Sequence, residues 1–330
     1  MDQEVAAAPV RATFESRAVP AAVLAEISAT PLTTQIYPVD KEVVRFAGKV
    51  LKVDTLVFRP GCKLLLLDNK QPWLAVVART IKFAAPDELG EIGVLPDDSV
   101  VPPLVHPWPV PPAASGKKGG KGENGTPGAN GVNGLRGVNG ADGPPVPALY
   151  LFADSIEAQP GGGIPDFISL RISSRGRYGA EGGTGQDGQS GGTGGDGGNG
   201  VWSNSRLQCT TAARSGGPGG AAGTAGDGGN GGRGGDGMLV HFAGSNQALN
   251  LFEYAKVNNF AGEPGLAGRA GINGSPGAGG DRGSRPGQCT GGSRGPNGAP
   301  AAGVPKDGQP GAPGKRGEIQ KQVLSVAALF

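Results

Sequence analysis

The sequence has few aromatic residues, little net charge and no long apolar run. Aromatic residues make up 5% of its 330 residues and the hydrophobic fraction is 37%, which leaves little material for two conventional cores. The formal net charge of +2 is too small to indicate a nucleic-acid binder. No stretch approaches about 18 consecutive apolar residues, so we expect no membrane insertion. The first residues, MDQEVAAAPVRATF, lack the pattern of a secretory signal, so we expect export by another route.

Cysteine and histidine are also scarce. The three cysteines, Cys62, Cys209 and Cys289, are too few and too scattered for a disulfide scaffold or a metal knuckle. Cys209 and Cys289 both lie where the glycine pattern described below is interrupted, so either one disulfide links these two loops or all three thiols are unpaired. His241 lies in an apolar, strand-like stretch, and no Ser-His-Asp set or Cys-His pair can be assembled. The sequence therefore predicts no enzyme and no cofactor.

Glycine is abundant and unevenly distributed. The chain has 64 glycines and 29 prolines, and only four of the glycines precede residue 116. We therefore predict five segments along the chain: an N-terminal arm (1–40), a β-rich domain (41–100), a proline-rich linker (101–115), a glycine-rich region (116–317) and a C-terminal strand (318–330).

Short apolar runs rich in β-branched residues characterise the segment before the linker. They recur every 7 to 10 residues between turn signals, which favours stacked strands over helices. We predict a parallel β-helix, and a small β-sandwich is the alternative. One short helix is expected in the arm, at Pro20–Ile27. The apolar runs are Leu56–Phe58, Leu64–Leu67, Leu74–Val77 and Ile81–Phe83.

Glycine recurs at every third position in the second half of the chain. A strict period of three indicates a helix with three residues per turn and one edge without side chains. The predicted fold class is therefore mainly β and polyglycine II: a β-rich domain followed by a bundle of polyglycine II helices with interspersed strands. A collagen-like trimer and a disordered region are the alternatives. The runs are Gly116–Gly143, Gly176–Gly200, Gly217–Gly235, Gly262–Gly283 and, more loosely, Gly292–Gly317.

The residues between the glycines predict how the runs pack. The runs 176–200 and 217–235 have two nearly bare rows, so we expect them inside, with their polar row in water, and the other runs outside. An apolar row on the first run could cover the bundle or meet a partner: Ala129, Val132, Leu135, Val138 and Ala141. Strands are expected where the runs are interrupted, at Ala148–Ala158, Asp166–Ser173, Met238–Phe242 and Leu249–Val257.

Two groups of proteins resemble the glycine runs. GENGTPGANGVNGLRGVNGADG and GGTGQDGQSGGTGGDGGNG are similar to the glycine-rich tips of phage long-tail-fibre adhesins and to other polyglycine II proteins, whereas GEPGLAGRAGINGSPGAGGDRG and GQPGAPGKRGE resemble bacterial collagen-like surface proteins. The adhesin resemblance implies receptor binding by loops at the end of the bundle. The candidate loops here are Trp202–Arg214, Ser245–Ala248 and Arg285–Thr290, and the candidate partner-binding residues are Trp202, Arg206, Arg214, Arg285 and the C-terminal Phe330.

A calcium-binding repeat is a weaker alternative. GGTGQD, GGTGGD and GGRGGD match the opening of the calcium-binding nonapeptide, with Asp187, Asp196 and Asp236 as the candidate ligands. Nine is a multiple of three, however, so a glycine lattice produces this match without calcium.

The sequence as a whole predicts a non-enzymatic structural or adhesive protein. Its role would be a self-assembling extracellular fibre or filament subunit, or a fibre-tip adhesin, outside the cell or on a virion surface. The expected partners are other copies of the chain or a fibre shaft protein, and a cell-surface receptor. A collagen-like homotrimeric surface protein and a calcium-binding repeat protein are the alternatives.

Overall fold

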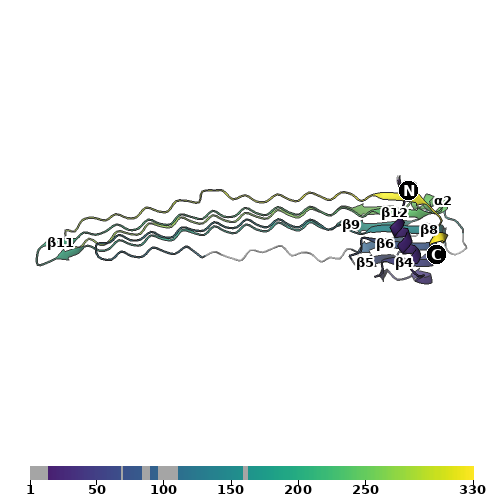
Figure 1. The fold of residues 1–330 in the computed structure, drawn as a ribbon, viewed down its shortest axis with the longest axis horizontal. Coiled ribbons are helices and arrows are strands. Elements are labelled where there is room, and N and C mark those ends of the chain that lie inside the picture. The colour runs from purple at the N-terminus through teal and green to yellow at the C-terminus, as the bar shows by residue number, and fades with distance from the viewer. Residues whose placement is uncertain (1–13, 68–69, 84–89, 96–110, 159–162) are drawn as a thin grey trace, which may run out of the picture.

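The computed structural model describes residues 14–67, 70–83, 90–95, 111–158 and 163–330. These residues form two regions, which Figure 1 shows end to end. One region, the head, contains two parallel β-sheets and two α-helices. The other, the stalk, contains the glycine runs and extends from one side of the head. The predicted linker lies outside the described residues up to position 110, and so do the first 13 residues of the arm.

The larger sheet of the head has seven strands in the order β1-β14-β12-β8-β6-β4-β2. All its neighbouring strands are parallel. Its longest strands, β6 and β8, lie side by side near its centre and are apolar over most of their length, as buried parallel strands are. The strands are β1 (Glu15–Ser16), β2 (Thr34–Val39), β4 (Val50–Phe58), β6 (Trp73–Phe83), β8 (Ala148–Ala158), β12 (Val240–Gly244) and β14 (Ile319–Val323).

The smaller sheet has five parallel strands in the order β13-β9-β7-β5-β3. Along the chain, strands of the larger sheet alternate with strands of this one from β2 to β9, and again from β12 to β14. Each sheet therefore grows by one strand with each repeat of the alternation. The strands are β3 (Val43–Phe46), β5 (Lys63–Leu67), β7 (Gly90–Leu95), β9 (Leu170–Arg175) and β13 (Lys256–Phe260).

Apolar side chains fill two clusters in the head. The larger cluster combines residues of both sheets with α2 (Asn246–Phe252), and it includes the fully buried rings of Phe58, Phe242 and Phe252. The smaller cluster packs α1 (Ala21–Ala29) and the 3₁₀ turn η1 (Val326–Leu329) on the larger sheet. Both clusters lie in the head, so the head is the part of the molecule that hydrophobic burial stabilises.

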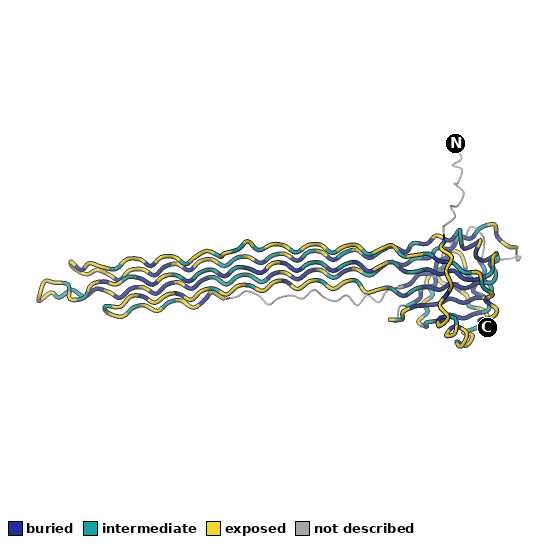
Figure 2. The backbone as a smooth tube through the Cα atoms, turned by 45° about the horizontal axis from the view of Figure 1, so that its top comes forward, coloured by how far each residue is buried: buried dark blue, intermediate teal, exposed yellow. Residues whose placement is uncertain are grey.

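The stalk consists of three excursions of the chain from the head. Each excursion leaves after a strand of the smaller sheet and returns to a strand of the larger one: from β7 to β8, from β9 to β12 and from β13 to β14. The described parts of these excursions run beside each other, so the stalk is several passes thick and the glycine runs lie side by side (Figures 1 and 2). The stalk is therefore made of three long connections, each of which joins a strand of the smaller sheet to a strand of the larger sheet.

Backbone hydrogen bonds join neighbouring passes along the stalk. Gly226 donates its N–H to the carbonyl of Gln186 (2.8 Å), and Gln186 donates to the carbonyl of Leu135 (2.8 Å), so these two bonds link three passes. The glycines allow this approach, because a Cβ on Gly226 would overlap the carbonyl oxygen of Leu135. The runs 176–200 and 217–235 are the more buried passes of the stalk.

Asparagine and aspartate side chains add a second set of bonds between passes. Asn133 Oδ1 accepts from the backbone N–H of Thr224 (2.9 Å), and Asp187 Oδ1 accepts from that of Ile272 (2.7 Å). The same arrangement recurs with separations of 91, 85 and 79 residues between acceptor and donor. The polar rows of the runs 176–200 and 217–235 were expected to lie in water, and Asp196 and Asp227 are exposed. Their side chains in addition accept hydrogen bonds from backbone N–H groups that the glycine bonds leave over.

The predicted fold class is wrong. The described residues form an α/β fold with a seven-stranded and a five-stranded parallel sheet, not a β-helix followed by a polyglycine II bundle. The apolar runs Leu74–Val77 and Ile81–Phe83 were expected to form two separate short strands of a β-helix. In the structure they belong to one long strand, β6. The glycine runs are extended chain without regular secondary structure, and the two short strands at the far end, 201–203 and 208–211, lie between two runs.

Several local expectations can be compared with the elements. Strand β8 has the bounds predicted for it, and α1 covers the helix expected at Pro20–Ile27. The expected strand at Leu249–Val257 is wrong over most of its length, because α2 occupies its first half. Ser245 starts that helix, since its side chain accepts a hydrogen bond from the N–H of Ala248.

Candidate functional site

The far end of the stalk brings three turns together. We call this end the distal tip and define it as residues 117–123, 196–214 and 281–294. Its parts are joined by backbone bonds from Gly198 to Glu123 (2.9 Å) and from Gly200 to Ser284 (2.9 Å). The middle turn carries the antiparallel strands β10 (Val201–Ser203) and β11 (Gln208–Thr211), which stand at the end of the molecule in Figure 1.

A disulfide between Cys209 and Cys289 joins two of these turns. The sequence allowed either this disulfide or three unpaired thiols, and the structure contains the disulfide. The third cysteine, Cys62, is free and buried in the head. The bond closes a loop of 80 residues, so it restricts the unfolded chain as well as the tip.

Trp202 links the same two turns, and Arg285 braces the turn 281–294 that carries it. Gly287 has φ +60°, and a Cβ there would overlap the Trp202 ring, so the indole lies directly against the backbone. Arg285 donates to the carbonyl oxygens of Gly291 and Gly292. Both side chains were expected to meet a partner. The structure gives them contacts within the tip, and these contacts order the turns.

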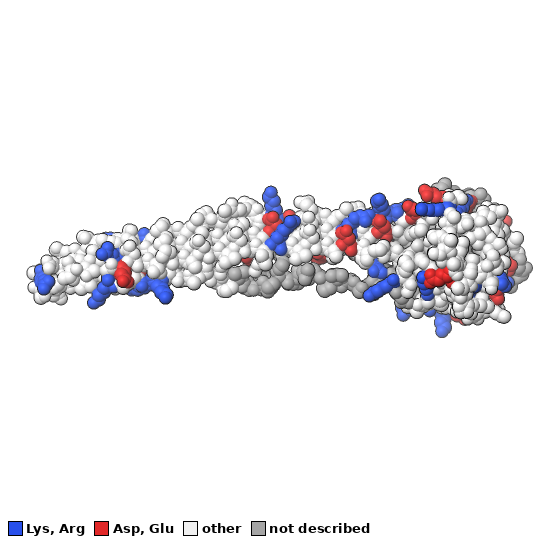
Figure 3. All heavy atoms as spheres, in the orientation of Figure 1, with Lys and Arg blue, Asp and Glu red and all other residues white. Residues whose placement is uncertain are grey.

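The end of the β10–β11 hairpin is exposed. Leu207 has 76% of its surface accessible and a positive φ of 48°, which places an apolar side chain outward at a tight turn. Arg206 and Arg214 are exposed as well, and on the face in Figure 3 basic side chains predominate at this end of the stalk. The tip thus presents one apolar group among cations on a braced scaffold.

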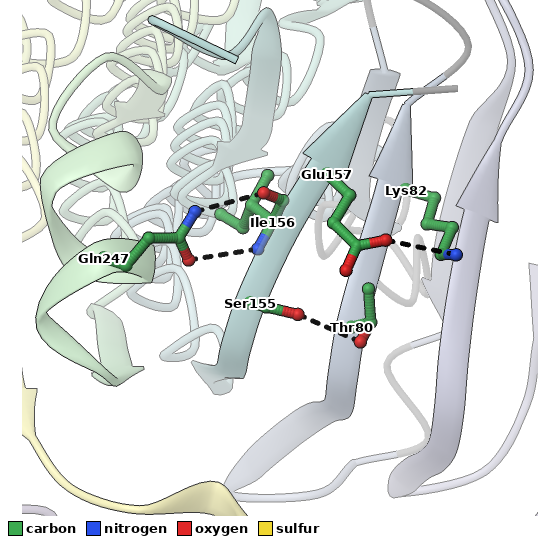
Figure 4. Close-up of polar contacts among 6 residues, drawn as sticks. All are labelled: Thr80, Lys82, Ser155, Ile156, Glu157 and Gln247. Carbon is green, nitrogen blue, oxygen red and sulfur yellow. Dashed lines mark hydrogen bonds and ion pairs between the residues drawn. The ribbon is translucent and has the colours of Figure 1, made fainter. Parts of the chain in front are cut away.

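Polar side chains in the head pair with each other along the larger sheet. Thr80 and Ser155 share a hydrogen bond (3.0 Å), and Lys82 lies 3.1 Å from a carboxylate oxygen of Glu157 (Figure 4). Gln247 makes two bonds with the backbone of Ile156, accepting from its N–H and donating to its carbonyl. The pairing of β12 with β8 ends at Gly244, and the amide of Gln247 provides hydrogen bonds to β8 beyond that point. We therefore assign these polar side chains a structural role.

Two further polar groups of the head are structural by their surroundings. His241 is buried beside the Tyr150 ring (5.6 Å between centroids), and burial lowers the pKa of its imidazole. Lys52 borders a pocket of about 310 Å³ and donates to the carbonyls of Ile27 (3.1 Å) and Thr30 (2.8 Å) at the end of α1. Burial, and then the charge of Arg79, lower the pKa of Lys52.

The three candidate calcium ligands are not brought together. Asp187, Asp196 and Asp236 each accept a backbone hydrogen bond from a neighbouring pass, and Asp236 also pairs with Arg233. Backbone hydrogen bonding is the first cause of the lowered pKa of Asp236. Across the part of the chain that the structure describes, no group of three or more acidic, histidine or cysteine side chains could hold a metal ion.

Two of the predicted partner-binding positions lie in the head and not at the tip. Phe330 packs under the guanidinium of Arg79, 4.3 Å from its ring centroid, and closes one side of the larger sheet. The loop Ser245–Ala248 begins α2, and the hydroxyl of Ser245 donates to the carbonyl of Asp154 (2.6 Å). The structure therefore gathers Trp202, Arg206, Arg214 and Arg285 at one end.

Sequence reasoning missed two features of the tip. Leu207 was not singled out, although a large aliphatic residue in a polar, glycine-flanked turn is a recognisable signal. Lys117, Lys118 and Lys121 were not considered either, although they lie between the first glycines of the run Gly116–Gly143. In the described residues no helix is long and apolar enough to cross a membrane.

Comparisons of the chain with protein families, with curated proteins and with solved structures find no match. Its function must therefore be inferred from the geometry of the described residues.

Proposed function

We propose that this chain is a non-enzymatic adhesive protein that works outside the cell or on a virion, where its stalk carries the distal tip to a receptor on a cell surface. The head provides the folded base from which the stalk extends. One observation carries the proposal: three turns from three separate excursions meet at the end farthest from the head, and a disulfide joins two of them. A spacer alone would not need its end braced in this way.

The disulfide also supports the proposed location. Disulfides persist in oxidising surroundings such as the outside of a cell or of a virion. Cys209 and Cys289 come from two different turns, so their bond serves the arrangement of the tip and not one local loop.

The pattern of backbone bonds favours a single-chain stalk over the collagen-like trimer. Glycine N–H groups such as those of Gly182 and Gly229 find acceptors in other passes of the same chain. A collagen triple helix would direct them to other chains.

A filament subunit is the second candidate, and the edges of the two sheets favour it. Strand β2 is an edge strand of the larger sheet, and β3 is an edge strand of the smaller one. Ile36, which lies in β2, is 62% exposed. An uncovered strand edge can pair with another chain. The adhesin and the filament subunit differ in which end of the molecule meets a partner.

Two matched variants separate these candidates. Leu207→Asn removes the exposed apolar group of the tip and keeps a residue that tolerates positive φ, whereas Ile36→Asn removes an exposed apolar group of the head. The measurement is binding of the fluorescently labelled chain to a panel of bacterial strains. We expect Leu207→Asn to weaken binding about tenfold or more and Ile36→Asn to leave it unchanged.

The opposite results would contradict the proposal. The adhesive function would be excluded if the Leu207→Asn variant bound as well as the unchanged chain, or if the chain bound to no strain. Regular fibres of the purified chain in electron micrographs that Ile36→Asn abolishes would support the filament subunit instead.

A further inference from the structure

Charge is segregated along the stalk. The distal tip carries eight basic and three acidic side chains, a net charge of +5, although the whole chain carries only +2. The other glycine-run residues, in the ranges 124–143, 176–195, 215–237, 262–280 and 295–317, carry seven basic and seven acidic side chains. The basic residues of the tip are Lys117, Lys118, Lys121, Arg206, Arg214, Arg282, Arg285 and Arg294, and the acidic ones are Glu123, Asp196 and Asp281.

We propose that the distal tip binds an acidic polysaccharide, one whose sugars carry carboxylate, phosphate or sulfate groups. This inference rests on the proposed function and names the chemistry of the receptor. A net positive end on an otherwise neutral rod raises the local concentration of a polyanion at that end alone.

Most of the cations of the tip are available to such a ligand. Arg294 lies 3.6 Å from Asp281, and Arg285 is engaged by backbone carbonyls. The other six basic side chains form no ion pair within the described residues, and all six are exposed. Their charges are therefore not neutralised inside the protein.

The groups between these cations suit sugars. Hydroxyl and amide side chains can donate to and accept from sugar hydroxyls, and the tip exposes several of them from two of its turns. They are Asn204, Ser205, Gln208, Thr210, Ser284, Gln288 and Thr290.

Nucleic acid and lipid fit the tip less well. Trp202 is the one aromatic residue among the tip residues, and its ring packs on Gly287, so the tip lacks the row of aromatic rings on which successive bases stack. Leu207 is the one large aliphatic side chain that the tip exposes, which is too little apolar area for a membrane surface.

The direct test measures binding of the intact chain to immobilised dextran sulfate, with neutral dextran and a duplex DNA as comparison surfaces. We expect binding to dextran sulfate that weakens steeply as salt is raised, because exposed charges are screened. Neutral dextran should not retain the chain, and DNA should retain it less than dextran sulfate does. Retention on DNA alone or more strongly on DNA would overturn the proposal.

Matched charge variants locate the binding. The tip variant is Lys117→Gln with Lys118→Gln and Lys121→Gln, and the control is Arg136→Gln with Arg269→Gln and Lys306→Gln, three exposed cations elsewhere on the stalk. Each cation near an anionic surface adds to binding, so we expect at least about a tenfold loss of affinity for dextran sulfate in the tip variant. The control should bind as the unchanged chain does, and an equal loss in both variants would overturn the proposal.

The same variants distinguish this inference from the proposed function. If Leu207→Asn abolishes cell binding while the three-lysine variant binds cells normally and dextran sulfate is not bound, the tip is an adhesive site for an uncharged receptor and this inference fails alone. If neither Leu207→Asn nor the lysine variant changes cell binding, both fail.

Discussion

The head and the stalk are held together by different forces. In the head, Phe152, Phe242 and many aliphatic side chains are fully buried, and the apolar clusters lie between and against parallel sheets. In the stalk the buried residues are mostly glycines, whose neighbours are the carbonyl groups of adjacent passes. One chain thus combines a core built by hydrophobic burial with a rod built by backbone hydrogen bonds.

Because the two regions are stabilised differently, different kinds of substitution should destabilise them. A core loses stability when side-chain volume is removed, whereas the stalk should lose it when volume is added or when a single acceptor disappears. Substitutions that are harmless in one region should therefore be harmful in the other, and three variants test this in order of expected effect.

The largest effect is expected from Phe242→Ala in the head. Phe242 is fully buried, and its ring lies 4.6 Å from that of Phe252 and 5.4 Å from that of Phe14. Removing it should cost about 3–5 kcal/mol of the free energy of unfolding. Denaturant unfolding measures this, and a loss below about 1 kcal/mol would show that the head does not depend on this core.

Adding one methyl group should be the damaging change in the stalk. Gly226→Ala places a Cβ on the carbonyl oxygen of Leu135, whereas the control Gly303→Ala meets only the methyl carbon of Thr224 at 3.2 Å. We expect Gly226→Ala to destabilise the stalk by about 1–3 kcal/mol and Gly303→Ala to change it by less than about 0.5 kcal/mol.

Hydrogen exchange of individual amides measures that difference region by region. Amides of the passes around Gly226 should exchange faster in the first variant, while those of β6 and β8 should keep their protection. Equal behaviour of the two alanine variants would contradict the close packing of the stalk.

The smallest effect is expected from Asn133→Ala. The substitution leaves the N–H of Thr224 without its acceptor, which should cost about 1 kcal/mol. Asn133→Asp keeps a carboxylate oxygen at that position, as Asp187 does in its own pass, and should be close to neutral. Exchange at the Thr224 amide distinguishes them, and equal protection in both variants would show that the side-chain acceptor is dispensable.

The sequence predicted local features of the fold better than its topology. The bounds of β8 and the position of α1 followed from apolar patterns, and the row composition of the glycine runs agrees with their burial. The division of the strands between two sheets was not predictable, because apolar runs do not state which strand pairs with which. The helix α2 was missed although Ser245 provides a capping signal.

The candidate site was predicted in part. Trp202 and Arg206 were located because they interrupt the glycine pattern, and the structure places them at the distal tip. The disulfide could not be assigned from spacing alone, since Cys209 and Cys289 are 80 residues apart and meet only because two excursions end together. The contribution of Lys117 to the tip depends on the same long-range arrangement.

Electron microscopy of the intact chain bound to cells, with a label attached to the head, shows which end of the molecule meets the receptor. We expect rods that stand on the cell with the distal tip at the surface and the labelled head away from it. Rods that bind through the labelled head, or that assemble into regular fibres without touching cells, would show that the tip is not the adhesive end.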